Sequence, residues 1–179
     1  MNAPFKTETL PTWRLDDLYS SRQDPRIEAD LKAAEATNAE LAKLEGRMLA
    51  TRGKPAQLGG IIDRGITLYE DAVNLMWSVG AYGSLSASTQ RDDPAWSKFE
   101  SDLRARSAQI GAMSLFFTLE INKLDDVELE AALKAHPPAA RWRPWLRQVR
   151  AARPHELSPD LERILIDMAP ASANWGRLS

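Results

Sequence analysis

Histidines and acidic residues are the side chains of this chain that could bind a metal ion, and their spacing favours structural roles. The only two histidines, His136 and His155, lie 19 residues apart, and each is next to a proline. A zinc site built on them would need carboxylates supplied by the fold, because zinc takes three or four protein ligands. We therefore interpret both histidines as surface or capping residues, with a metal site as the alternative.

Pairs of adjacent aspartates are the next candidates for cation binding: Asp16-Asp17, Asp92-Asp93 and Asp125-Asp126. The second and third pairs precede expected helices, where a carboxylate accepts hydrogen bonds from free amides and meets the positive end of the helix dipole. Helix capping is the prediction for these two pairs. The role of the first pair is left open.

Arginine and tryptophan are mixed over residues 141–147, and Arg150 and Arg153 follow this run. Such a mixture can bind a nucleic-acid backbone and stack its bases. Against that function, the chain has a net charge of −2, and acidic residues follow closely at Glu156, Asp160 and Glu162. The prediction is instead an amphipathic helix that packs through its apolar residues, Trp145, Leu146 and Val149.

Motifs that carry catalysis are missing from the sequence. It contains no HExxH, no glycine-rich phosphate loop and no GxSxG, and it has no cysteine. These patterns would supply a zinc-peptidase helix, a nucleotide site, a serine nucleophile and a thiolate, respectively. We predict no catalytic, cofactor-binding or metal-ligating residue in this chain.

Apolar residues recur at helical spacing along most of the chain. A first helix is predicted from Asp24-Pro25 to about residue 51, ended by the glycine and proline that follow. A second helix is predicted over 56–86, where Gly80 and Gly83 would let a neighbouring helix approach closely. A third begins at Asp93-Pro94 and runs through Ile121, and a short fourth covers about 126–135.

The two ends of the chain differ from this helical middle. Residues 1–23 are predicted to be an extended arm, held to the fold by apolar side chains at Trp13, Leu15, Leu18 and Tyr19. From residue 137 onward, six prolines divide the chain into short helices, the clearest of which begins at Ser158-Pro159. The last residues have the pattern of an interrupted helix, so we expect a truncated chain.

The predicted fold is therefore all-α: an N-terminal arm over 1–23, an antiparallel bundle of long helices over 24–136, and the truncated start of a second helical domain over 137–179. The composition, with 44% apolar residues in 179, is sufficient for a buried core. No run approaches the roughly 20 apolar residues of a membrane span, and the N-terminus has no signal-peptide pattern. A soluble, cytoplasmic protein without a membrane or nucleic-acid partner is expected.

Three stretches resemble oligoendopeptidase F, of the M3 family of zinc metallopeptidases. They occur in the order found in that family: LPTWRLDDLYSSRQDPRIEADL, MSLFFTLEINKLDDVELEAAL and WLRQVRAARPHELSPDLERIL. The resemblance implies a full-length zinc peptidase that hydrolyses short peptides, with HExxH and a distant glutamate beyond this chain. It also implies that the chain is an N-terminal helical lobe, inactive alone, which helps to form the wall of the peptide cleft.

The resemblance further implies a partner for the C-terminal region. We expect 137–179 to pack against the missing catalytic part, or to self-associate, because it carries many large apolar residues: Trp142, Trp145, Leu146, Leu165, Met168, Trp175 and Leu178. Two other functions stay open. One is a helical adaptor, which an exposed apolar groove would favour, and the other is a regulator or pseudoenzyme derived from the peptidase.

Overall fold

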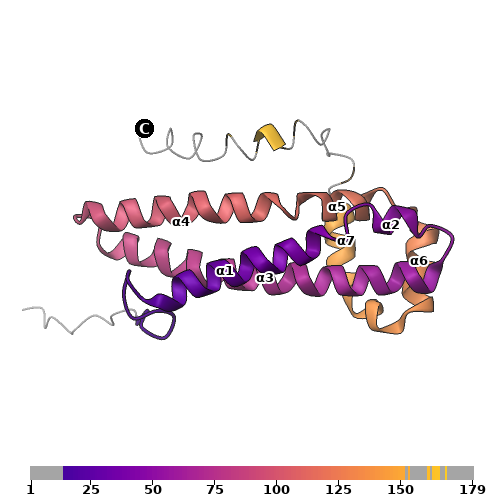
Figure 1. Cartoon of the computed structure of the whole chain (residues 1–179), viewed down its shortest axis with the longest axis horizontal. Helices are drawn as coiled ribbons and strands as arrows, with labels where there is room; N and C mark the ends of the chain where they lie inside the picture. The colour runs from indigo at the N-terminus through magenta and orange to yellow at the C-terminus, as the bar shows by residue number, and fades with distance from the viewer. Residues whose placement is uncertain (1–13, 152, 154–160, 162, 166–167, 169–179) are drawn as a thin grey trace, which may run out of the picture.

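The computed structural model describes residues 14–151, 153, 161, 163–165 and 168, and these residues form helices joined by turns (Figure 1). No strand occurs among them. The elements are α1 (Pro25–Ala42), α2 (Arg47–Ala50), α3 (Pro55–Thr89), α4 (Pro94–Ala112), α5 (Leu115–Asn122), α6 (Asp126–Ala135), the 3-10 helix η1 (Pro137–Trp142) and α7 (Arg143–Ala151). The predicted all-α class is confirmed.

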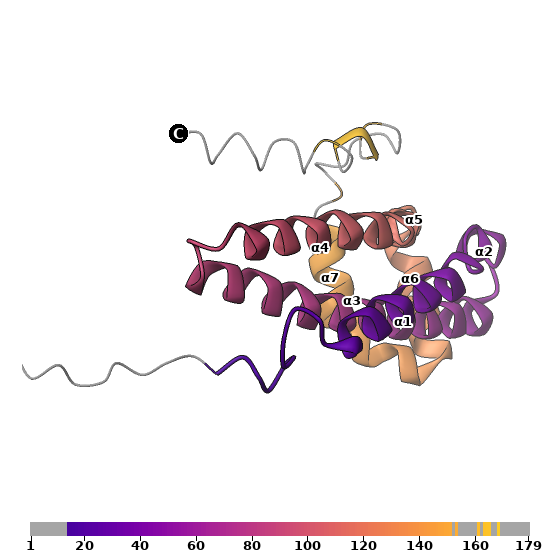
Figure 2. The same ribbon diagram turned by 60° about the vertical axis from the view of Figure 1, so that its left-hand side comes forward.

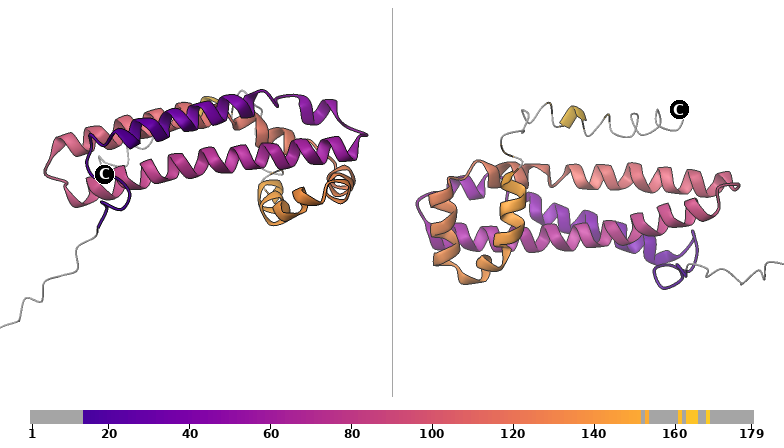
Figure 3. Two further views of the ribbon diagram at one scale, coloured as in Figure 1. Left: turned by 60° about the horizontal axis from the view of Figure 1, so that its bottom comes forward. Right: turned by 180° about the vertical axis from the view of Figure 1, so that it is seen from behind.

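Helix α3 is the axis on which the other elements are placed. It has 35 residues, which corresponds to about 52 Å of helix. Helices α1 and α4 pack along it, and α4 returns beside α3 as a hairpin (Figure 2). Helix α6 and η1 pack on the N-terminal half of α3, and α7 gathers with them at that end (Figure 3).

Two apolar cores share α3. The first joins the N-terminal half of α3 to the end of α1, α2, α5, α6, η1 and α7, with Leu58, Ile62 and Phe117 fully buried in it. The second joins the C-terminal half of α3 to α1, α4 and the residues before α1, with Val79 and Ile110 buried in it. No helix of the described residues combines the length and apolarity that a membrane crossing requires.

The start of α1 is set by Asp24, as predicted. Its carboxylate accepts hydrogen bonds from the backbone N–H of Arg26 at 2.9 Å and of Ser20 at 2.8 Å, and Pro25 occupies the first helical position. The Arg26 guanidinium and these amides hold the pKa of Asp24 well below its usual range. This cap fixes the direction in which the preceding residues join the bundle.

The residues before α1 lie against the second core. Leu15 and Leu18 pack on it, and Tyr19 is buried, with its hydroxyl donating to Asp30 at 2.7 Å and its ring edge-on to Tyr82. The predicted anchoring of the arm is confirmed for these three residues. Trp13 lies outside the described residues, and the division of the chain at residues 23 and 136 stays a prediction.

The first predicted helix is interrupted, contrary to expectation. Helix α1 ends at Ala42, and the chain turns before α2 through Gly46, whose φ is +75°. That left-handed conformation favours glycine. The Gly46 N–H donates at 2.5 Å to Oε1 of the buried Glu120, which comes from α5. The break is thus stabilised by a side chain 74 residues away.

The third predicted helix is also divided in two. Helix α4 ends at Ala112, and the Ser114 hydroxyl donates to the Gly111 carbonyl at 2.9 Å before α5 begins. Ser side chains that bond nearby backbone in this way compete with helical continuation. Met113 at this break is exposed, whereas Phe117 and Ile121 are buried in the first core.

Only one of the two glycines predicted to allow close helix approach does so. A methyl group at Gly83 would come within 2.8 Å of Leu103 Cδ1, but at Gly80 it would meet nothing within 4 Å. Two other glycines have that role instead. A methyl group at Gly59 would lie 2.6 Å from the Ala132 carbonyl oxygen, and one at Gly65 would overlap the Phe117 ring.

Candidate functional site

His136 forms no site of the kind that metal binding requires. It follows the last residue of α6, where its N–H donates to the Ala132 carbonyl, and its Nε2 lies 3.7 Å from Asp63 Oδ2. Its position at the helix end agrees with the predicted capping role. His155 lies outside the described residues, so the alternative of a metal site on the two histidines stays untested.

Asp63, on α3, is the acceptor at which the arginine and tryptophan run is attached. Trp142 Nε1 donates to Asp63 Oδ1 at 2.8 Å, and Arg141 Nη2 lies 3.2 Å from the same oxygen. The Arg141 guanidinium also stacks on the Trp142 ring. These groups hold η1 to α3, and the carboxylate that could have ligated a metal is occupied by them.

The remaining part of the run packs as predicted. Leu146 is buried in the first core, and Trp145 and Val149 pack against that core, with Trp145 stacked on Phe117. Arg150 donates to the carbonyl oxygens of Ile121 and Leu124, both at 2.7 Å. The basic and aromatic groups therefore attach η1 and α7 to the bundle, which argues against the nucleic-acid alternative.

The aspartate pairs behave differently from one another. Asp93 caps α4 by accepting from the Ala95 N–H at 2.9 Å, as predicted. Asp125 occupies the N-cap position of α6 and Asp126 lies in its first turn, as predicted, but the Asp125 side chain forms no capping hydrogen bond. Asp126 accepts from Arg150 at 2.5 Å. Asp16 and Asp17 both lie within ion-pair distance of the exposed Arg14.

Zinc, which the family resemblance implies for the full-length protein, does not fit the residues described. No three His, Asp or Glu side chains come together among them in a way that could hold a metal ion. The one histidine they include faces a carboxylate already bonded to Trp142 and Arg141. No chemical step through a metal can be built on these residues.

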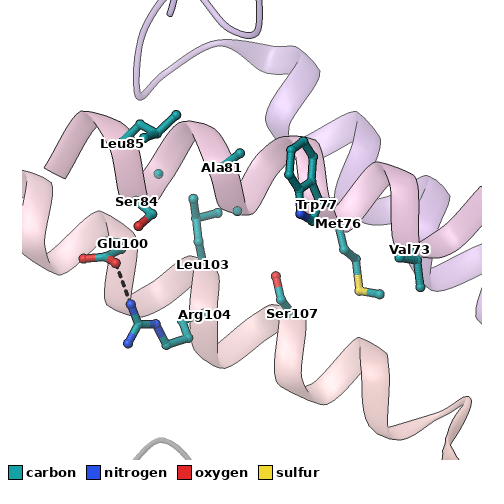
Figure 4. A pocket seen from close by; sticks show the side chains of 12 residues that line it. Val73, Met76, Trp77, Ala81, Ser84, Leu85, Glu100, Leu103, Arg104 and Ser107 are labelled. Atoms are coloured by element: carbon teal, nitrogen blue, oxygen red, sulfur yellow. Dashed lines mark hydrogen bonds and ion pairs between the residues drawn. The ribbon is translucent and has the colours of Figure 1, made fainter. Parts of the chain in front are cut away.

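An apolar groove between α3 and α4 is the best-formed candidate for binding. It has a volume of about 650 Å³, and most of its wall is apolar. Figure 4 shows its lining: α3 contributes Val73, Met76, Trp77, Gly80, Ala81, Gly83, Ser84 and Leu85, and α4 contributes Glu100, Leu103, Arg104 and Ser107. The sequence analysis did not predict this groove.

Trp77 is the most unusual member of the groove. Its side chain is 73% exposed, and Leu85, two turns along α3, is 41% exposed. Large apolar side chains gathered on a surface mark sites of association, and tryptophan is enriched at the energetic centres of interfaces. The signal that the sequence offered was a large apolar residue, Trp77, beside the polar residues Asn74 and Ser78 on the expected helix.

The polar groups of the groove lie on α4. Arg104 Nη2 donates to Glu100 Oε1 at 2.5 Å, one turn away, and both residues line the groove (Figure 4). The Ser107 hydroxyl is buried and has no hydrogen-bond partner among the described residues. The groove therefore suits an apolar ligand surface better than a charged one.

Comparison with known families identifies the last part of the chain. A model of the N-terminal region of M3 peptidases, described as oligopeptidase F, matches residues 120–179. Residues 120–179 are therefore similar to the N-terminal part of oligopeptidase F. The predicted family is thereby confirmed, and a search of curated proteins and one of solved structures each gave no match.

The part matched to oligopeptidase F is built into the rest of the bundle. It begins at the buried Glu120 and includes α6, η1 and α7. Leu129, Leu133 and Leu146 from this region share one core with Leu58, Ile62 and Ile66 of α3, which precede the match. The groove, by contrast, lies wholly on α3 and α4, before the matched residues.

Proposed function

We propose that this chain is the non-catalytic helical lobe of a cytoplasmic, oligopeptidase F-like zinc metallopeptidase that hydrolyses short peptides. In this proposal the lobe supports the catalytic part and contributes to the wall of the peptide cleft. The observation that carries it is the match of residues 120–179 to oligopeptidase F. The shared core between that region and α3 extends the relation to the preceding helices.

The chemistry of the described residues suits a supporting role. The carboxylates around α6, η1 and α7 are joined to arginines, as in the Arg143 to Glu130 pair at 2.5 Å. Groups held in this way fix helices relative to one another and are not poised for proton transfer. In the proposal, the zinc and the general base belong to residues outside this chain.

Purified chain provides the first test. It is expected to retain no stoichiometric zinc after dialysis. It should also leave short fluorogenic peptides, of roughly 5 to 15 residues, uncleaved. Zinc retained at one equivalent, together with peptide cleavage that co-purifies with the chain, would contradict the assignment of a non-catalytic lobe. Elemental analysis and a peptide-cleavage assay measure the two outcomes.

A second test asks whether the lobe belongs to a larger enzyme. The gene is sequenced past codon 179, and the proposal predicts an open frame that reaches HExxH and a downstream glutamate. A stop codon directly after Ser179 would contradict it and would favour the regulator or pseudoenzyme. The helical adaptor is a second candidate function, favoured by the exposed groove around Trp77.

A further inference from the structure

A buried carboxyl group from α5 holds the turn between α1 and α2. Glu120 is only 6% exposed, and its Oε1 accepts a hydrogen bond at 2.5 Å from the N–H of Gly46, the glycine whose φ is +75°. Its Oε2 is also buried, and it has no hydrogen-bond partner among the described residues. Burying a charged oxygen without partners is costly, because the water that would solvate it is lost. The site therefore favours the neutral form of Glu120.

The charged groups around Glu120 do not reverse this preference. Burial is the largest influence and raises the pKa of Glu120, and the carboxylate of Glu45 raises it further. The Gly46 N–H and Lys123 each lower the pKa by less than burial raises it. The turn, α2 and α7 lie against α5 and carry further basic side chains, which are exposed or paired with other acids: Lys43, Arg47, Arg143, Arg147 and Arg150. Ionisation of Glu120 is therefore opposed by its surroundings.

The segment over residues 45–51 is the part of the fold best able to relieve that opposition. It contains α2, in which only Met48 of the four residues is buried. Its ends are fixed, because Leu44 before it is buried and the Arg52 guanidinium after it donates to the Lys123 carbonyl. A short segment that buries one side chain can open locally without unfolding the rest of the protein. We call residues 45–51 the flap.

We propose that the flap is a pH-sensitive switch, closed over α5 while Glu120 is neutral and opened to water when Glu120 is ionised. In the open form, water reaches both carboxylate oxygens, so the charge is no longer buried. The hydrogen bond from Gly46 is lost at the same time, and Met48 leaves the first core. Protonation of Glu120 reverses these changes. None of these contacts depends on the peptidase assignment, so a chain without a switch would leave the proposed function intact.

The direction of the pH dependence follows from the two forms of the flap. In the closed form the pKa of Glu120 lies above its ordinary value, whereas in the open form water restores that value. The closed form therefore binds the proton more tightly, and it is most stable below the ordinary glutamate pKa. As pH rises from the open-form pKa to the closed-form pKa, opening increases by about tenfold for each unit between them, and it then levels off.

Nuclear magnetic resonance of the full chain, from about pH 4 to about pH 8, measures both parts of the proposal. The Gly46 amide shift should titrate with a midpoint above the ordinary glutamate pKa, because that amide bonds the carboxyl group directly. The Ala50 and Thr51 amides donate to carbonyl oxygens within the flap. Their hydrogen-exchange protection, corrected for the intrinsic pH dependence of exchange, should fall by about tenfold as pH rises to the same midpoint.

Two variants separate the switch from a general effect of pH. Glu120→Gln should remove both titrations and leave the protection of Ala50 and Thr51 independent of pH. Glu45→Gln should retain both titrations, because Glu45 is exposed. The wild-type measurement decides the matter even if Glu120→Gln does not fold. A Gly46 midpoint at the ordinary glutamate value, or flap protection that stays constant through a raised midpoint, would overturn the proposal.

Discussion

The two halves of α3 have the same periodicity but different surroundings. In the N-terminal half, Leu58, Ile62 and Ile66 are buried under α6, α5 and their neighbours. In the C-terminal half, Val79 and Tyr82 are buried against α1 and α4, but Trp77 and Leu85 on the adjoining face are exposed. The difference shows that a wide apolar stripe is fully buried only when helices cover both of its sides.

Glycines mark the same contrast. Gly59 and Gly65 lie where α6 and Phe117 approach the N-terminal half closely enough to leave no room for a methyl group. Gly80 faces open space in the groove of the C-terminal half. At Gly80 the helix lacks a side chain without allowing a close contact, so this half of α3 is the open one.

The largest expected difference between the halves comes from truncating an aromatic residue in each. Phe117→Ala should lower the free energy of unfolding by about 3 to 5 kcal/mol, because Phe117 is fully buried against Gly65, Tyr69 and Trp145. Trp77→Ala should change it by less than about 0.5 kcal/mol, because Trp77 is exposed. Urea unfolding followed by circular dichroism measures both, and equal losses would show that the two halves are packed alike.

Adding a methyl group to each half should give changes of opposite sign. Gly65→Ala should destabilise the fold by about 1 to 3 kcal/mol, because the new methyl group overlaps the Phe117 ring. Gly80→Ala should stabilise it by about 1 kcal/mol, since the position is helical and open. Thermal unfolding of the two variants measures the changes, and a destabilising Gly80→Ala would contradict the open groove.

A smaller effect is expected from Glu120, a buried carboxyl group of α5 that faces the turn at Gly46. Burial raises the pKa of Glu120 above its ordinary value, so the folded state holds the proton more tightly than the unfolded state. The contribution of Glu120 to the free energy of unfolding is therefore greatest below its pKa in the unfolded state, and it falls as pH rises through its pKa in the folded state. Glu120→Gln should remove this fall, so its unfolding free energy relative to wild type should increase from pH 4 to pH 7.

Chemical unfolding of both proteins across this pH range tests the sign. A difference between Glu120→Gln and wild type that is independent of pH would mean that Glu120 titrates normally. Glu45→Gln is the matched control, since Glu45 lies nearby but is exposed. It should leave the pH dependence nearly unchanged.

The features predicted well from sequence are those that depend on neighbouring residues. Asp24-Pro25 and Asp93-Pro94 predict where α1 and α4 begin, because a capping acid and a first-turn proline act within one helical turn. The packing of Trp145 and Leu146 followed from helical spacing alone. The peptidase family was indicated by residue order within stretches, two of which overlap the matched region.

The features that were missed depend on residues far apart in the chain. The turn at Gly46 is held by Glu120, and the need for glycine at Gly65 comes from Phe117. Helical periodicity does not distinguish Gly65 from Gly80, although only Gly65 has a close neighbour in the fold. The groove escaped prediction for the same reason, because whether Trp77 is covered depends on which helices stop short of it.

Hydrogen exchange along α3 tests most directly the claim that its two halves differ in closure. Amides of residues 58–66 should be the better protected, since several helices of the same chain cover this half. Amides of residues 73–85 should exchange faster, because the face that carries Trp77 and Leu85 is exposed. Equal protection along the whole of α3 would contradict the account.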